Sequence, residues 1–469
     1  MLVRDDFVRI GKQGVGNPRS QIAHSMAKFR GRIYLGVTHP KADGPTDAAR
    51  ILRYVEATGE WETVHKSPLV RTDENASVKD IYRQNMGEGG GALSEPTSPY
   101  VPRDRGYRCM TLYTPGADAE PVLFTSTLSH WGSRLLVSRD GESFEVASEP
   151  GLGREDILSF RNLVPFNNKL FVAPAGSVQD GVMDRNFGDI ARLFVADDPL
   201  SGEWREAMEP GFGDPNNLSI FCMRTFNGFL YAGTGNPKRG FQLWKTRAEG
   251  EPPFQWTCVL HDGAYRYNIN ETAATLVEFD DHLYLSSGIP GLGMDMANDI
   301  GPAAAELIRL DRDDRWELIA GEPRFTPDGH KVPLSLMGPG FDEPENSVFW
   351  SMTAHDGALY VGTHHNQMWR TALGGADEVL GGFHLWSTTD GENFAPITLD
   401  GFGDPYATGV RSLLSTPEGL FVGTTTHRDV ERLWRLRTRK GGRAGIGGLE
   451  IWLGKQGSTN NGGTAPSTQ

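Results

Sequence analysis

Cationic side chains occupy one recurring position of a repeated sequence unit. When the first strands of seven predicted repeats are aligned on the turns that follow them, this position is filled by His24, Arg108, Arg161, Phe221, Ala274, Trp350 and Arg411. Three arginines and a histidine at one level are unusual in a chain with a formal net charge of −14. Guanidinium groups repel one another unless an anion joins them, and their fork of N–H donors fits a carboxylate or a phosphate. The position therefore predicts an anion-binding site, with Trp350 and Asn236 as further substrate contacts.

A structural explanation of the three arginines stays open. Each of them could pair with an acidic side chain of a neighbouring connection, such as Asp156, Asp214 or Glu345. Pairs of this kind are common between the repeats of a fold, where they hold neighbouring units together. The sequence does not decide between a ligand site and such pairs.

Histidines form a second group, because half of the twelve are expected on the same face of the fold. They open the first repeat or follow second strands, at His24, His39, His130, His364, His365 and His427. Imidazole titrates near neutral pH after a small shift and is the commonest metal ligand. We therefore predict four catalytic acids or bases, His24, His39, His365 and His427. The alternative is a single divalent transition metal held by members of the set His39, His130, His364, His365 and His427, although no HExxH or paired CxxC motif accompanies them.

The segment Arg432–Arg443 (RLWRLRTRKGGR) is strongly basic. It is expected to join the second and third strands of the last repeat, on the same face as Arg411. Either it is a solvated loop or it forms a cap that attracts an anionic ligand. Its place in the repeat slightly favours the cap.

The elements that position these residues follow from a phrase that recurs along the chain, consisting of a turn, a hydrophobic–aromatic pair and a small polar run. Seven copies place an aromatic residue in each second strand, at Tyr34, Phe124, Phe171, Tyr231, Tyr284, Tyr360 and Phe421. After each phrase comes a third strand, and in six of the seven repeats a tight turn and a fourth strand that opens on an aromatic residue follow it. The predicted fold class is therefore all-β, as a single seven-bladed β-propeller of four-stranded blades.

The ring is expected to close through the N-terminus. The last repeat stops after its third strand, at 448–454, whereas the segment DDFVRIG at residues 5–11 offers the missing fourth strand. Closure removes the edge strands that otherwise promote aggregation. Residues 1–456 are thus predicted to form one propeller domain, followed by a disordered tail over 457–469.

Two tight turns, at 138–144 (SRDGESF) and 387–394 (STTDGENF), carry the pattern Ser/Thr-x-Asp-Gly-x-x-aromatic. They resemble the Asp-box turn of sialidase-like, BNR-type propeller repeats. The resemblance is close at these two turns and loose in most other blades. It implies an architecture and brings no catalytic residues with it.

Loop lengths predict which face is functional. The loops between second and third strands and the connections between blades vary greatly in length, while the other turns are tight. Long loops on a rigid scaffold usually carry the binding site. Glycine phrases such as GFGDP, at Gly211 and Gly401, lead into strands, so they are interpreted as turns between blades and not as a dinucleotide-binding loop.

The blades differ strongly at the predicted mouth, which favours one asymmetric site. We predict an enzyme of the lyase, cyclase or isomerase type that acts on an anionic small molecule by His-based or metal-assisted chemistry. The alternative is a non-catalytic propeller, either lectin-like or a protein-interaction module. The acidic net charge argues against nucleic-acid and membrane partners. Three widely spaced cysteines and the lack of a signal-like N-terminus predict a cytoplasmic protein.

Overall fold

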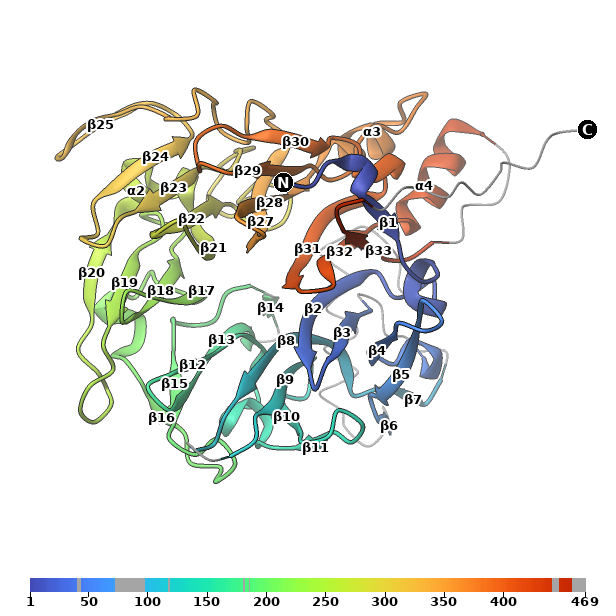
Figure 1. Ribbon diagram of the computed structural model, residues 1–469, viewed down its shortest axis with the longest axis horizontal. Coiled ribbons are helices and arrows are strands. Elements are labelled where there is room, and N and C mark those ends of the chain that lie inside the picture. Colours follow the sequence, from blue (N-terminus) through green and yellow to red (C-terminus); the bar gives the residue numbers. More distant parts are fainter. Residues whose placement is uncertain are drawn as a thin grey trace, which may run out of the picture.

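The computed structural model describes residues 1–39, 44–71, 98–116, 119–179, 182–184, 186–440 and 447–457. The fold is all-β, with short helices at α2 (Asp262–Tyr265), α3 (Gln367–Gly374) and α4 (Asp429–Thr438). Figure 1 shows the strands arranged in groups around a common centre, which is a β-propeller architecture. Within the described ranges, no helix is long and apolar enough to cross a membrane. The predicted tail from residue 458 onward, and residues 72–97, lie outside the described residues.

Antiparallel pairing sorts most strands into four-stranded groups, each named after its first strand. The β2 group contains β2 (Ile22–Phe29), β3 (Arg32–Thr38), β4 (Arg50–Val55) and β5 (Glu60–Lys66). The β8 group contains β8 (Asp104–Tyr113), β9 (Val122–Ser129), β10 (Leu135–Ser138) and β11 (Glu145–Val146). The β12 group contains β12 (Ile157–Phe166), β13 (Lys169–Gln179), β15 (Phe194–Ala196) and β16 (Arg205–Glu206).

The next three groups repeat the same order. The β17 group contains β17 (Ser219–Phe226), β18 (Phe229–Gly235), β19 (Leu243–Thr246) and β20 (Thr257–Leu260). The β21 group contains β21 (Thr272–Phe279), β22 (His282–Gly288), β23 (Leu307–Leu310) and β24 (Trp316–Ala320). The β27 group contains β27 (Asn346–His355), β28 (Ala358–His365), β29 (Leu385–Thr388) and β30 (Ala395–Thr398).

The β31 group takes its fourth strand from the start of the chain. It contains β31 (Ala407–Thr416), β32 (Gly419–Thr426), β33 (Ile451–Gly454) and β1 (Phe7–Arg9). Phe7 pairs with Gly454 and Arg9 with Trp452, so β1 is shorter than the predicted strand 5–11. Short extra strands lie outside this order: β14 (Val182–Asp184) pairs with β13, β6 (Leu69–Arg71) with β7 (Tyr100–Pro102), and β25 (Arg324–Thr326) with β26 (Gly329–Lys331).

The core lies between neighbouring groups and not within a single one. Phe29, Tyr34 and Ile51 of the β2 group, for example, pack with Tyr107 and Leu123 of the β8 group. A similar cluster joins the last group to the first, where Phe421 and Ile451 pack against residues of β2 and β3. Burying apolar surface between sheets therefore holds each group to the next.

The two predicted Asp-box-like turns are stabilised by their own carboxylates. Asp140 accepts hydrogen bonds from the backbone N–H groups of Glu142 and Ser143, both at 2.8 Å. Asp390 does the same for the residues two and three positions further on, at 2.9 and 2.8 Å. An Asp side chain that caps a turn in this way replaces hydrogen bonds that the backbone cannot make.

Candidate functional site

The position found by aligning the seven repeats with one another is a β-bulge in the first strand of every group, which we call the inner strand. In β2 the pairing with β3 moves from Ala23 to Ser25, which leaves His24 without a partner in the ladder. The same shift leaves out the residues at the equivalent position of β8, β12, β17, β21, β27 and β31, which are Arg108, Arg161, Phe221, Ala274, Trp350 and Arg411. A bulge adds one residue to a strand and re-aims its side chain. This device explains why side chains of such different types share one level.

Hydrogen bonds between neighbouring groups fix the bulged strands. Ser25 Oγ donates to the backbone carbonyl of Tyr107 at 2.9 Å, and Ser126 Oγ donates to that of Phe160 at 2.8 Å. Ser286 and Phe349 are joined likewise at 2.8 Å, and Ser412 and Ala23 at 2.7 Å. These carbonyls precede a bulge or lie beside it, where the ladder is interrupted. Each bond therefore satisfies a buried backbone group and locks the bulge in place.

The three arginines face His24 together. Burial lowers the pKa of His24 well below its usual value, and the charges of Arg411, Arg108 and Arg161 lower it further. His24 is accordingly neutral at physiological pH. Its Nδ1 lies 2.8 Å from Thr38 Oγ1, whereas its Nε2 makes no hydrogen bond with any residue in the described part of the chain.

Two of the arginines are stacked on aromatic rings of neighbouring bulges. The guanidinium carbon of Arg161 lies 4.0 Å from the ring centroid of Phe221, and that of Arg411 lies 5.0 Å from the ring of Trp350. Stacking orders the plane of a guanidinium group and leaves its N–H edges available. Arg161 also donates to Asn186 Oδ1 at 2.7 Å, and Arg108 donates to Ser159 Oγ at 2.6 Å.

Arg411 has no counter-ion among the described residues. Its side chain makes neither an ion pair nor a hydrogen bond with any of them, and burial lowers its pKa to about 10. The pKa of Arg108 falls to about 9, because it is buried and lies near Arg411. Both groups remain charged at neutral pH, so positive charge gathers around His24.

The acidic residues that offered a structural explanation are engaged elsewhere. Asp156 pairs with Arg154 at 3.0 Å, and Glu345 pairs with Arg370 at 2.6 Å. Asp214 accepts from the amides of Asn216, Asn236 and Gln242. None of these three contacts involves an arginine at a bulge.

Two of the remaining predicted catalytic histidines, His39 and His365, are more deeply buried than His24. His39 has no exposed surface and its Nε2 lies 3.2 Å from Ser20 Oγ; burial and three arginine charges lower its pKa to about 3. His365 is 1% exposed, with Nδ1 3.0 Å from Asn346 Oδ1 and Nε2 3.4 Å from Gln367 Oε1. The structure thus gives both residues internal partners and no exposed nitrogen.

His364 lies near Arg411, and His427 lies near His364. The ring of His364 packs against that of Trp350 at 4.7 Å, and burial with the charges of His427, His365 and Arg411 lowers its pKa to about 3. His427 is partly exposed and its ring lies 4.7 Å from that of Trp369. His130 is hydrogen-bonded through Nε2 to Arg105 at 2.8 Å. In the described ranges, no three His, Cys, Asp or Glu side chains are grouped so that they could hold a metal ion.

Asn236 has a local role. Its Nδ2 donates to Asp214 and to Asn217 Oδ1, and its Oδ1 accepts from the backbone N–H groups of Lys238 and Arg239. Both donors and both acceptor positions of the amide are occupied, and the residue is fully buried. The structure therefore places Asn236 in the loop after β18 without a free polar atom for a substrate.

Sequence reasoning missed His384 and the polar partners of the arginines. The His384 ring stacks on that of His365 at 4.4 Å, and its Nδ1 accepts from Asn346 Nδ2 at 3.1 Å. It directly precedes β29, a place that Gln242 and Glu306 fill before their own third strands. The sequence repeat alone could have shown that these three positions are equivalent. The contacts of Ser159 and Asn186 with arginines had no sequence signal.

Residues 432–438 of the basic segment lie in α4, which Figure 1 shows toward the outside of the strand groups, beside α3. It does not lie over the centre of the strand groups in this view. Residues 441–446 of the segment are outside the described residues.

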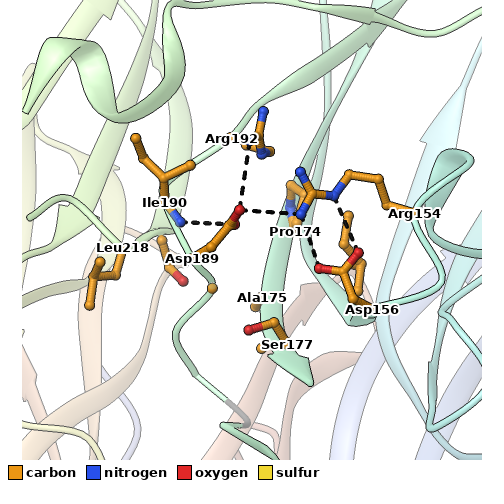
Figure 2. Close-up of a pocket in the computed structure, with 13 residues that line it drawn as sticks. Arg154, Asp156, Pro174, Ala175, Ser177, Asp189, Ile190, Arg192 and Leu218 are labelled. Atoms are coloured by element: carbon orange, nitrogen blue, oxygen red, sulfur yellow. Dashed lines mark hydrogen bonds and ion pairs between the residues drawn. The ribbon is translucent and has the colours of Figure 1, made fainter. Parts of the chain in front are cut away.

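A pocket lies beside the β12 group, between the end of β13 and the start of β17. Figure 2 shows that its charged side chains are paired with one another. Arg154 contacts Asp156 at 3.0 Å and Asp189 at 3.2 Å, while Arg192 contacts Glu206 at 2.6 Å. The pocket walls are therefore electrically balanced, unlike the surroundings of Arg411.

Comparison with known proteins gives no family. No protein-family model matches the sequence, and no curated protein matches it. Among solved structures, a GH74 enzyme of Niastella koreensis is 12% identical over 91% of this chain, with a TM-score of 0.43, and the chain spans 60% of that enzyme. The polysaccharide lyase Uly1 is 12% identical over 95% of this chain and 96% of its own, with a TM-score of 0.48. U3-55K is 10% identical over 97% of this chain and 100% of its own, with a TM-score of 0.45.

Proposed function

We propose that the strand groups are the blades of a seven-bladed propeller and that β1 completes the last blade. The pairing of β1 with β33 supports this reading, as does the apolar cluster that joins the β31 group to the β2 group. A ring of this kind leaves a central region into which the bulged residues project.

We further propose that this region is the active site of an enzyme that binds an anionic small molecule, bearing a carboxylate or a phosphate. The observation that carries the proposal is Arg411, a buried cation stacked on Trp350 without a counter-ion among the described residues. A desolvated charge without a partner is costly, and a ligand carboxylate or phosphate would offset that cost. Arg108 and Arg161 lie close enough to influence the same imidazole and would extend the site.

His24 is the proposed acid/base residue. Its depressed pKa makes it a weak base in the empty site, because a proton on the ring would add to the surrounding positive charge. A bound anion would neutralise part of that charge and raise the basicity of Nε2. The site would then gain its base only when substrate is present. Nε2 is the proposed proton acceptor, since Nδ1 already contacts Thr38.

Lyase, cyclase or isomerase chemistry fits these parts. A guanidinium group that neutralises a carboxylate stabilises the charge that develops when a neighbouring proton is removed. A covalent cysteine mechanism fits less well, because burial raises the pKa of Cys109 to about 11 and that of Cys222 to about 12. Both thiols are thus protonated at neutral pH and are poor nucleophiles.

Calorimetry tests the binding part of the proposal. Phosphate, sulfate and acetate would be titrated into the parent protein, the Arg161→Ala/Arg411→Ala variant and Arg224→Gln, which removes an exposed arginine of β17. We expect the double variant to lose binding at least tenfold and Arg224→Gln to match the parent. Equal affinity for all three proteins would refute the site.

Turnover separates the enzyme from the non-catalytic alternative. A panel of small carboxylates and phosphate esters would be incubated with the parent and with His24→Gln, and the mixtures followed by NMR. We expect a compound that binds to be consumed by the parent and to survive with the variant. Compounds that bind but never change would favour a lectin-like or other ligand-binding propeller.

A further inference from the structure

The helix α4 is held against α3 by contacts at the end of α3. Trp434 Nε1 donates to the carbonyl of Ala376 at 2.8 Å, and Arg437 and Lys440 donate to the carbonyls of Leu373 and Asp377. Val430 is buried in a small cluster with Met368 of α3. Cationic side chains are favourable at a helix C-terminus, where carbonyl groups lack partners. One side of α4 is therefore fixed to the protein.

The other side of α4 presents two leucines and an arginine together. Leu433 is 47% exposed and Leu436 is 67% exposed. Arg432 is also exposed and lies four residues before Leu436. Residues three or four apart are neighbours on a helix surface. We call the surface formed by Arg432, Leu433 and Leu436 the α4 face.

The cations around the α4 face have no counter-ion in the part of the chain that the structure describes. Arg432, Arg437, Arg439 and Lys440 form no ion pair there, whereas some exposed arginines elsewhere do so. Arg205, for example, pairs with Asp197 and Glu251, and Arg312 pairs with Asp281. Acidic residues outnumber basic ones, 60 to 46, in the whole chain. An unpaired basic surface on such a protein is complementary to an acidic partner.

The mixture of side chains indicates what kind of partner fits. A helix that lies in a membrane interface has its apolar and basic residues on opposite sides, but the more apolar side of α4 is already buried against α3. A nucleic acid would use the arginines and gain nothing from exposed leucines. Protein interfaces combine apolar anchors with arginine at one surface. The leucines and the unpaired cations together therefore favour a polypeptide.

We propose that the α4 face docks an acidic polypeptide segment that carries apolar side chains. The partner's carboxylates would pair with Arg432 and its neighbouring cations, while its apolar residues would cover Leu433 and Leu436. This surface is separate from the bulged arginines, so the proposal stands independently of the enzymatic one.

The test uses the full chain and labelled peptides of about 15 residues. One peptide is an amphipathic sequence of Glu and Leu, a second has Ser in place of Leu, and a third has Lys in place of Glu. The protein variants are Leu433→Ser/Leu436→Ser, Arg432→Gln/Arg439→Gln and the control Arg224→Gln. Fluorescence anisotropy gives the dissociation constants, and thermal melting checks that the variants fold.

We expect only the Glu/Leu peptide to bind with appreciable affinity. The leucine and arginine variants should each weaken binding about tenfold or more, and Arg224→Gln should leave it unchanged. Absence of binding up to about 1 mM peptide would overturn the proposal, since even 4 kcal/mol would be detected there. Equal binding of the Glu/Ser peptide would reduce the surface to a general polyanion site and overturn it. Leucine-dependent binding to phosphatidylserine vesicles, or leucine-dependent self-association in sedimentation, without peptide binding would also overturn it.

Discussion

Replacing Gly141 with alanine should weaken the joint between the β2 and β8 groups. Gly141 has φ +80° in the turn between β10 and β11, and a Cβ built on it would overlap the hydroxyl of Tyr34 and lie 2.8 Å from its Cζ. The left-handed backbone costs a non-glycine residue about 1–2 kcal/mol. Moving the buried Tyr34 ring adds about 1–3 kcal/mol of overpacking. The expected loss in the free energy of unfolding is therefore about 2–5 kcal/mol.

A second glycine separates the two contributions. Gly153 has φ +91°, but nothing lies within 4 Å of its Cβ position, so Gly153→Ala carries the backbone cost alone. Denaturation by urea, followed by tryptophan fluorescence, would compare the two variants with the parent. We expect Gly141→Ala to unfold at clearly lower urea concentration than Gly153→Ala.

Removing the hydroxyl of Tyr34 should restore part of the stability that Gly141→Ala loses. In a double-mutant cycle, Tyr34→Phe and Gly141→Ala should couple by at least about 1 kcal/mol, because the double variant no longer has the overlapping oxygen. Equal midpoints for Gly141→Ala and Gly153→Ala, together with no coupling to Tyr34→Phe, would refute the steric reasoning.

Three further predictions concern buried charge. Glu306→Ala should lower the free energy of unfolding by about 3–5 kcal/mol, because the fully buried Glu306 binds Arg324 through two contacts of 2.9 Å and the arginine would lose its partner. Urea denaturation measures the change, and a loss under about 1 kcal/mol would contradict the prediction. Sulfate affinity should rise as the pH falls from about 8 to 5 in the parent but not in His24→Gln, because a bound anion raises the depressed pKa of His24 and binding then takes up a proton. Calorimetry in two buffers of different ionisation enthalpy measures the number of protons taken up, and zero uptake by the parent would contradict the prediction. Stability should fall as the pH drops below about 6.5, because the histidines of the unfolded chain then bind protons that the buried histidines of the folded protein do not bind until about pH 3. Burial lowers the pKa to about 3 at His39, His364 and His384, and each contributes up to about 1.4 kcal/mol per pH unit. The variant His39→Gln should therefore show a smaller loss of stability per pH unit than the parent.

The sequence was informative wherever one rule applies to every repeat. The second-strand aromatics and the aligned position of the first strands could be found because each recurs, and the structure places the three arginines close enough to His24 to lower its pKa. The bulge itself was not predictable, because a single inserted residue leaves no mark on the alternation of one short strand. Because the bulge occurs at the same position in all inner strands, the repeats could be aligned without knowing that a bulge is present.

Properties that depend on local packing could not be predicted. The burial of His39 and His365, the closed hydrogen bonding of Asn236 and the position of α4 at the rim follow from loops that differ between repeats. Residue type and chain position do not tell whether a histidine nitrogen faces a serine or a ligand. The same limit explains why the acidic residues proposed as arginine partners have other partners in the structure.

The bulges also bear on how such a protein could change its ligand. A residue left out of the ladder makes no backbone pair across the strands, so its side chain can be exchanged with little effect on the sheet. The inner strands carry His, Arg, Arg, Phe, Ala, Trp and Arg at this one position, while the residues on either side keep their pairing. The scaffold thus offers a set of positions whose side chains can vary without disturbing the pairing of the sheet. Selection could change the side chains at these positions one strand at a time, while the surrounding architecture stays as it is.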